Sequence, residues 1–168
     1  EFINSKVELV SLNSINIKNS IIPYYKYLKK NDFDFVFSNI WPINLISAFF
    51  KILGLKTNMI LIEHCNLSEE FRKKSFFFKF LQNISIYIFY RFADKIISVS
   101  RGVQDDLIAK GAPKNKSIVI YNPLFNSSNS NIKNNIEEKK YLNWNKEVCY
   151  KIISIGQLKK QKNIPNLI

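Results

Sequence analysis

The sequence predicts an α/β protein built on a mostly parallel β-sheet flanked by helices. Three apolar runs, at residues 33–38, 58–63 and 95–99, have the length and the β-branched or aromatic composition of strands. Segments long enough for helices separate these runs, and strands that alternate with helices form βαβ units. The hydrophobic fraction of 46% favours a folded core over a disordered chain.

The amino-terminal part of the chain is predicted to contain strands at residues 7–12 and 33–38 and helices near residues 21–30 and 43–53. The second strand is short, aromatic and β-branched, which suits a pleated sheet. Gly54 directly follows the second helix, where a glycine favours helix termination. The predicted order is therefore strand, helix, strand, helix.

Residues 58–63 form the next predicted strand, and one long helix is expected over residues 68–92. Acidic residues near the start of that helix suit the positive end of its dipole. The strand at residues 95–99 follows, and Ser100 is a preferred type of residue for capping the helix that comes next. Residues 117–121 form the last strand of this series.

A change in composition divides the chain into two domains. Residues 126–147 are dominated by Asn, Ser, Lys and Glu and are typical of a linker. Residues 1–125 then form a partial first domain, and residues 148–168 begin a second one with a strand, a loop that Gly156 opens and a helix from Asn163. We expect this second domain to be cut short.

The chain is strongly basic, with 25 Lys and Arg residues against 13 Asp and Glu residues and a formal net charge of +12. Such a field favours anionic partners, namely nucleotide phosphates, nucleic acids or acidic lipid headgroups. The alternative is that the lysines are spread over solvated faces. Cys65 and Cys149 match neither a metal-ligand spacing nor a CxxC pair, which is typical of a reducing compartment.

No segment of the sequence is predicted to cross a membrane. The longest apolar stretch, residues 76–92, is interrupted by charged and amide side chains and is shorter than the ~20 residues that a bilayer requires. Residues 1–6 lack the basic segment and apolar run of a signal peptide. Because the chain does not begin with Met, we expect it to be a piece of a longer protein.

His64 is the only histidine, and it directly follows the predicted strand at residues 58–63. Ligands of parallel α/β sheets bind at the carboxyl ends of the strands, and an imidazole both donates and accepts hydrogen bonds. His64 is therefore the first candidate site residue, with a structural role in capping the following loop as the alternative. A Cys65–His64 nucleophilic pair is disfavoured because adjacent strand residues point to opposite faces.

Several short motifs, in one order and spacing, carry a resemblance to a known family. They are Ala-Asp-Lys-Ile-Ile-Ser-Val-Ser at residues 93–100, Val-Gln-Asp-Asp-Leu at 103–107, Ile-Val-Ile-Tyr-Asn-Pro at 118–123, Gly-Gln-Leu at 156–158 and Lys-Asn at 162–163. In this arrangement, residues 33–168 resemble retaining GT-B glycosyltransferases, and specifically the large family 4 of bacterial sugar transferases. The resemblance implies a Rossmann-like amino-terminal domain and the start of a second Rossmann-like domain that binds the donor.

The resemblance also implies roles for individual residues. His64 would face the cleft between the domains and contact the substrates near the reacting carbon. Gly156 and Lys162 would meet the donor's diphosphate, since fixed cations stabilise the charge that develops on a leaving group. Gln157 stands where the family has an Arg, so this position can donate a hydrogen bond but supplies no charge.

Four further positions are candidates for the substrate cleft. Asn39 and Trp41 follow the strand at residues 33–38 and would line the acceptor side. Ser100 ends another strand and either caps the next helix or contacts substrate. Asn122 precedes a proline and would form a turn near the cleft.

The function implied by the resemblance is transfer of a sugar, with retention, from a nucleotide-sugar donor to a glycan or lipid-linked acceptor. The expected donor is a UDP-sugar, and the expected setting is assembly of bacterial surface polysaccharide. No cluster of Asp or His has metal-ligand spacing, so neither a metal nor another cofactor is expected. The family's glycine-rich opening loop and its paired glutamates have no counterpart here, which predicts little transferase activity for this piece alone.

An acidic membrane surface is a further expected partner. The predicted helix at residues 68–92 carries many aromatic residues beside Arg72, Lys73, Lys74 and Lys79, a composition typical of helices that lie on a membrane. The alternative is a helix packed on the sheet with its lysines in water. The expected location is cytoplasmic, with peripheral attachment to the inner face of the plasma membrane.

A different class of function is a basic α/β domain that binds nucleic acid or nucleotides without catalysis. Its support is the net charge of +12. Against nucleic acid, the lysines are scattered, and the sequence has no zinc-finger, KH-type or RNP1 signature. The sequence likewise has no GxGxxG or Walker loop that would indicate another nucleotide-binding protein.

Overall fold

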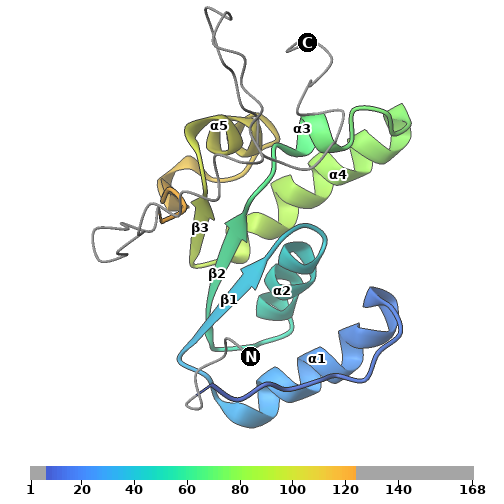
Figure 1. Cartoon of the computed structure of the whole chain (residues 1–168), viewed down its shortest axis with the longest axis vertical. Helices are drawn as coiled ribbons and strands as arrows, with labels where there is room; N and C mark the ends of the chain where they lie inside the picture. Colours follow the sequence, from blue (N-terminus) through green and yellow to red (C-terminus); the bar gives the residue numbers. More distant parts are fainter. Residues whose placement is uncertain (1–6, 124–168) are drawn as a thin grey trace, which may run out of the picture. The chain divides into compact units, whose positions relative to one another are not determined.

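The computed structural model describes residues 7–123 of the 168-residue chain (Figure 1). In this part, four strands form one sheet in the order β1-β2-β3-β4, and each neighbouring pair is parallel. The strands are β1 (Phe35–Asn39), β2 (Asn58–Glu63), β3 (Lys95–Ser98) and β4 (Ser117–Val119). The predicted α/β fold with a parallel sheet is confirmed.

Helical segments precede the sheet and connect its strands. They are α1 (Ile17–Asn31) before β1, α2 (Ile43–Ile52) before β2, α3 (Leu67–Glu70), α4 (Phe76–Phe89) and η1 (Tyr90–Phe92) before β3, and α5 (Arg101–Ala109) and η2 (Lys114–Lys116) before β4. Consecutive right-handed crossovers in this strand order place α2, α4 and α5 on the same face of the sheet. On the other face, Phe35, Phe37 and Ile118 are exposed.

The core lies between the sheet and this helical layer. Met59 and Leu61 of β2 are fully buried, as are Phe50 of α2, Ile86 of α4 and Leu107 of α5. Side chains alternate across a strand, so the residue that follows Met59 and Leu61 on the same face is Glu63. The core therefore ends on a carboxylate at the carboxyl end of β2.

The predicted strand at residues 7–12 is wrong. Val7, Leu9 and Val10 are exposed and belong to no strand, and α1 begins at Ile17, earlier than predicted. A strand forms only where a neighbouring strand satisfies its backbone groups, and these residues pair with none in the described part. The side chain of Asn16 instead caps α1 by accepting a hydrogen bond from the Asn19 N–H at 3.0 Å.

The single helix predicted over residues 68–92 is also wrong, because the segment is broken. α3 ends at Glu70, and a turn over residues 71–75 separates it from α4. Ser75 caps α4, with its hydroxyl accepting a hydrogen bond from the Phe78 N–H at 3.3 Å. A serine in this position competes with helix continuation, which explains why an apolar and basic run does not form one helix.

Other predicted boundaries agree more closely. The strand at residues 58–63 is β2, and the helix predicted after Ser100 is α5. The last strand ends at Val119 rather than at residue 121, although the Ile120 N–H still donates to the Ser98 carbonyl at 3.0 Å. The predicted linker at residues 126–147 and the predicted second-domain start at 148–168 lie outside the described residues.

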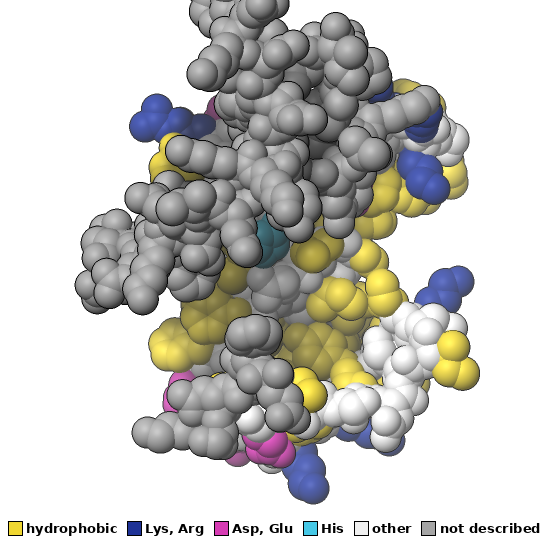
Figure 2. Space-filling view, in the orientation of Figure 1, with side chains coloured by type: hydrophobic (Ala, Val, Ile, Leu, Met, Phe, Trp, Pro, Cys, Tyr) yellow, Lys and Arg dark blue, Asp and Glu magenta, His cyan; other side chains and the backbone are white. Residues whose placement is uncertain are grey.

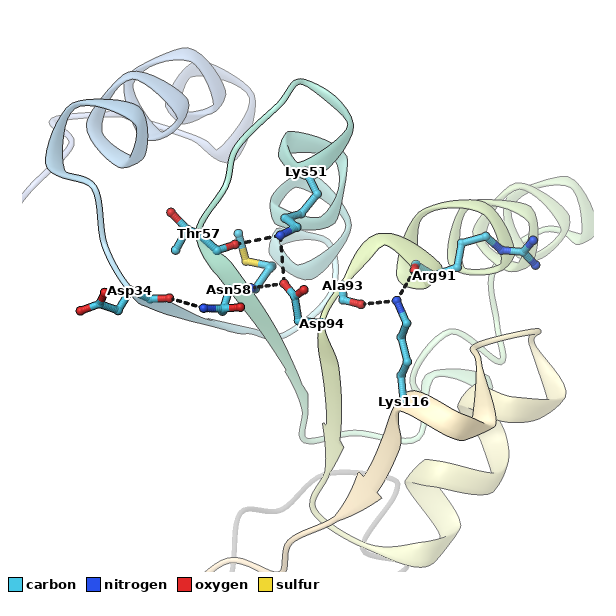
Figure 3. A network of polar contacts seen from close by, with 9 residues as sticks. Asp34, Lys51, Thr57, Asn58, Arg91, Ala93, Asp94 and Lys116 are labelled. Atoms are coloured by element: carbon cyan, nitrogen blue, oxygen red, sulfur yellow. Dashed lines mark hydrogen bonds and ion pairs between the residues drawn. The ribbon is translucent and has the colours of Figure 1, made fainter.

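Polar contacts made by charged side chains join the amino ends of the strands (Figure 3). The Asp94 carboxylate accepts a hydrogen bond from the Met59 N–H at 2.7 Å and lies 3.1 Å from the Lys51 ammonium. The Lys116 ammonium donates to the carbonyls of Arg91 and Ala93 at 2.7 and 2.8 Å. These contacts join β2, β3, α2 and η2 at the edge of the sheet opposite His64.

Candidate functional site

Two of the predicted site residues meet at the carboxyl edge of the sheet. Asn39 ends β1, and His64 follows the end of the neighbouring parallel strand β2. His64 Nε2 lies 3.2 Å from Asn39 Oδ1, and both side chains are exposed. Because an amide oxygen only accepts, Nε2 carries the proton in this contact. A ring that carries its proton on Nε2 alone leaves Nδ1 as a hydrogen-bond acceptor.

A buried carboxylate anchors the strand end that carries His64. Glu63 accepts a hydrogen bond from Asn44 Nδ2 at 2.8 Å and another from the Tyr90 hydroxyl. Asn44 Nδ2 also lies 2.8 Å from the Ile62 carbonyl, and the Trp41 backbone N–H donates to Glu63 as well. These contacts fix the end of β2 to α2 and η1. The Glu63 cluster is defined as Glu63, Asn44 and Tyr90.

Burial dominates the electrostatics of this cluster. Burial raises the pKa of Glu63 above its usual value, and the hydrogen bonds from Tyr90 and Asn44 oppose this effect only partly. Burial likewise raises the pKa of Tyr90 well above its usual value, and the charge on Glu63 and the hydrogen bond to it raise it further. Tyr90 is therefore a protonated hydrogen-bond donor throughout the physiological pH range.

Trp41 packs into an aromatic cluster. Its ring centroid lies 5.1 Å from that of Phe71 and 5.8 Å from that of Phe78, with edge-to-face geometry in both pairs. Its indole Nε1 is buried and makes no hydrogen bond within residues 7–123. Trp41 therefore shapes the loop that follows Asn39 and anchors it to the start of α4. The aromatic cluster is defined as Trp41, Phe71 and Phe78.

The remaining candidates make no hydrogen bond to the His64–Asn39 pair within residues 7–123, or lie outside the described residues. Ser100 caps α5, with its hydroxyl accepting a hydrogen bond from the Val103 N–H at 3.3 Å, so the capping role is confirmed. Asn122 is exposed beyond β4, and no hydrogen bond described for residues 7–123 joins it to His64 or Asn39. The predicted donor-phosphate residues Gly156, Gln157 and Lys162 lie outside the described residues.

The Glu63 cluster was not among the predicted site residues. One signal was present, because Met59, Leu61 and Glu63 alternate on one face of a predicted strand and the last of them is charged. A charged residue that continues a buried face indicates a carboxylate with partners. Asn44 and Tyr90 gave no such signal, because they reach Glu63 from α2 and η1 through the tertiary fold.

A cavity of about 510 Å³ lies at the other edge of the sheet. Its lining includes Asp34 and Asn58, which lie at the amino ends of β1 and β2, and Lys29 of α1. Acidic and basic side chains are mixed in this lining, and His64 and Asn39 take no part in it. It is therefore separate from the candidate site.

Comparison with known proteins identifies one family. Residues 11–124 match the model of the family described as Glycosyltransferase Family 4. The match spans more than half of the chain and includes Asn39, His64 and the whole Glu63 cluster. No curated protein and no solved structure matches the chain.

Proposed function

The chain belongs to glycosyltransferase family 4, and on this premise we propose that it takes part in transferring a sugar from a UDP-sugar to a glycan or lipid-linked acceptor. The observation that carries the proposal is the exposed His64–Asn39 pair at the carboxyl edge of a parallel sheet. We further propose that the transfer retains the anomeric configuration and that it serves the assembly of bacterial surface polysaccharide.

In this proposal His64 positions a substrate hydroxyl. Asn39 holds Nε2, so Nδ1 accepts a hydrogen bond from a sugar or acceptor hydroxyl near the reacting carbon. Asn39 keeps its amide N–H₂ group for a second hydroxyl, although that group also lies 3.3 Å from the Phe37 carbonyl. A hydrogen-bond acceptor, His64 Nδ1, beside a hydrogen-bond donor, the Asn39 amide, suits neighbouring hydroxyls of a sugar ring.

The Glu63 cluster would make this site rigid. Glu63 immediately precedes His64, and its buried hydrogen bonds fix the backbone from which His64 projects. Asn44 ties the same carboxylate to the start of α2, a few residues after Asn39. A ligand-contacting pair is effective when the residues beneath it fix its geometry.

The bond to the leaving diphosphate would be broken without a metal. Lys162, together with Gly156 and Gln157, would meet the negative charge that develops on the diphosphate as the glycosidic bond breaks. Because Gln157 brings no charge, the cationic contribution in this part of the proposal comes from Lys162. Lys159 or Lys160 is a candidate to replace the missing charge.

The test uses the gene product as it occurs in the cell, a panel of UDP-sugars and assays for UDP release. We expect His64→Ala to lower kcat/KM by at least about 100-fold and Asn39→Ala by a smaller factor. Asn115→Ala, which removes an exposed asparagine in η2, is the matched control and should leave the rate unchanged.

Binding is measured separately on the same proteins. His64 is the only histidine of these 168 residues, and the imidazole NMR signals that are lost in His64→Ala are assigned to it. We expect a UDP-sugar together with an acceptor sugar to shift these signals in wild type and in Asn115→Ala. A transfer rate in His64→Ala equal to that of wild type would contradict the proposal. So would His64 imidazole signals whose chemical shifts do not change with any UDP-sugar or acceptor.

A further inference from the structure

The outward face of α4 is apolar. Exposed apolar side chains on this helix include Phe76, Phe77, Phe80, Leu81, Ile84 and Ile88. The inward face, by contrast, includes Gln82, which is buried and whose amide atoms have no hydrogen-bond partner within residues 7–123. A helix with apolar residues on its solvent side is typically covered by another surface.

Cations border this apolar face at both ends. Arg72, Lys73 and Lys74 are exposed in the turn before α4, and Arg91 is exposed after it. The Arg91 guanidinium lies 4.1 Å from the centroid of the Tyr87 ring, so it borders the last turn of α4. Residues 71–92 contain no Asp or Glu. Figure 2 shows Lys and Arg side chains interspersed with hydrophobic ones over this part of the molecule.

We propose that this surface, the α4 patch, docks on an anionic lipid bilayer with α4 lying in the interface. The α4 patch is Phe76, Phe77, Phe80, Leu81, Ile84, Ile88, Arg72, Lys73, Lys74 and Arg91. Helices with a large apolar face and bordering cations bury that face in the headgroup region while their cations contact acidic lipids. No helix of residues 7–123 is long and apolar enough to cross a bilayer.

Charge favours a lipid surface over a second copy of this chain. The α4 patch has cations and no carboxylates, so two copies facing each other would bring like charges together. The chain as a whole carries +12, which adds long-range attraction to an anionic surface. An acidic bilayer supplies an apolar medium for the phenylalanine, leucine and isoleucine side chains of the patch and negative charge for its cations.

The aromatic cluster connects the α4 patch to the candidate site. Phe71, in the turn before α4, and Phe78, in the first turn of α4, contact Trp41, which follows Asn39 by two residues. Docking through α4 would therefore keep the loop after β1 close to the headgroups. The additional claim that the sugar acceptor is carried by a lipid rests on the proposed function. Membrane docking through α4 does not depend on that function.

The first experiment is flotation of the purified chain with vesicles of phosphatidylcholine alone or mixed with phosphatidylglycerol. We expect flotation only with the mixed vesicles, and less of it as salt is raised. Phe77→Gln/Phe80→Gln removes side chains that are 67% and 50% exposed, and it should lower vesicle binding by at least about 10-fold.

The matched control removes two equally exposed phenylalanines from another surface. Phe35 and Phe37 on β1 are 58% and 57% exposed, on the sheet face opposite the helical layer. We expect Phe35→Thr/Phe37→Thr to bind vesicles as wild type does. An equal loss in both variants would overturn the proposal, because it would show that any exposed apolar surface is sufficient.

A second pair of variants tests the cations. Lys73→Gln/Lys74→Gln should weaken binding to the mixed vesicles by about 10-fold. Its control is Lys29→Gln/Lys30→Gln in α1, which removes the same charge from another adjacent pair of exposed lysines. The pairs also match in their ring contacts, because Lys74 and Lys29 each lie 5.8 Å from an aromatic centroid. Equal losses in the two variants would show unspecific attraction and would overturn the proposal.

Two further readouts keep the result decisive. Circular dichroism and thermal unfolding identify any variant that fails to fold, in which case the exposed lysine pairs decide the question. Size-exclusion chromatography tests self-association. If wild type forms an oligomer that Phe77→Gln/Phe80→Gln dissociates, and wild type does not float with vesicles, then a second copy covers α4 and the proposal is overturned. No assay here measures sugar transfer, so failure of the proposed function would leave these outcomes unaffected.

Discussion

The Tyr90 hydroxyl donates a hydrogen bond to the buried carboxylate of Glu63, joining η1 to the end of β2 directly beneath the candidate site. Burial raises the pKa of Glu63 above its usual value of 4.5, although Tyr90 and Asn44 donate hydrogen bonds to it. Between the usual value and the raised one, the folded protein binds more protons than the unfolded chain does. The free energy of unfolding therefore falls as pH rises through this window.

Glu63→Gln should remove this pH dependence. We expect the free energy of unfolding of wild type, relative to the variant, to fall as pH rises above 4.5 and to level off above the folded-state pKa of Glu63. Urea unfolding of both proteins at a series of pH values measures the difference. A difference that stays constant between about pH 4 and about pH 8 would mean that burial does not perturb this carboxylate.

Tyr90→Phe should destabilise the protein and widen the same pH window. The buried Glu63 carboxylate would lose one donor, which costs about 1–3 kcal/mol, and its pKa would rise further because that hydrogen bond favours the charged form. Tyr24→Phe is the matched control, because the Tyr24 hydroxyl lies 3.1 Å from the neutral Ser47 hydroxyl. The control variant should be destabilised without a new dependence on pH between about 4 and 8, as urea unfolding would show.

Asp94 should make the opposite contribution at lower pH. Partial burial acts to raise its pKa, but the Met59 N–H and the charges of Lys51 and Lys116 together lower it below the usual 3.8. Its stabilising effect is therefore present above pH 3.8 and is lost as pH falls through the folded-state pKa. The Asp94 side chain is 40% exposed, so solvent screens the effect and it should be small.

Unfolding of Asp94→Asn measures that contribution, since Asn keeps an acceptor for the Met59 N–H and loses only the charge. Wild type should lose its advantage over this variant below pH 3.8, a range in which Glu63 is protonated in both states. If the advantage of wild type were already lost above pH 4.5 as pH falls, the effect would have to be assigned to another group.

The parallel sheet could be predicted from sequence because its strands carry local signals. β2 coincides with the apolar run at residues 58–63, and Ser100 could be recognised as a helix cap from its type and position. His64 could be placed at the edge of the sheet by the same reasoning. Its neighbour Asn39 was predicted to line the cleft, whereas the contact between them depends on the pairing of β1 with β2.

Two of the failures have the same physical cause, which is that local patterns do not specify partners, and the third depends on a local helix cap. Residues 7–12 are rich in Val and Leu, as a strand would be, but no strand of the described part pairs with them. Residues 68–92 are continuously rich in apolar and basic residues, yet Ser75 caps a new helix inside them. In the sequence, Glu63 looks like a solvated residue at the end of a strand. In the structure, Asn44 and Tyr90, from distant parts of the sequence, donate hydrogen bonds to it.

Two glycines that end helices provide a last, internally controlled prediction. Gly54 follows α2 with a φ of +86°, and Gly111 follows α5 with a φ of +93°, so alanine is strained at either position. A Cβ at position 54 would meet no atom within 4 Å, whereas one at position 111 would lie 2.6 Å from Tyr87 Cδ2. Gly54→Ala should therefore cost about 1–2 kcal/mol, and Gly111→Ala about 1–3 kcal/mol more, as urea unfolding would measure.

The steric part of that difference can be isolated with Tyr87. Its Cβ lies 3.2 Å from the position of the added methyl group, so rotation of the ring alone cannot remove the overlap. Combining Gly111→Ala with Tyr87→Ala should recover most of the excess cost, and the same truncation combined with Gly54→Ala should recover none. Additive effects in the Gly111 double-mutant cycle would show that Tyr87 and position 111 do not interact, and that the packing of α4 against the end of α5 is looser than the structure indicates.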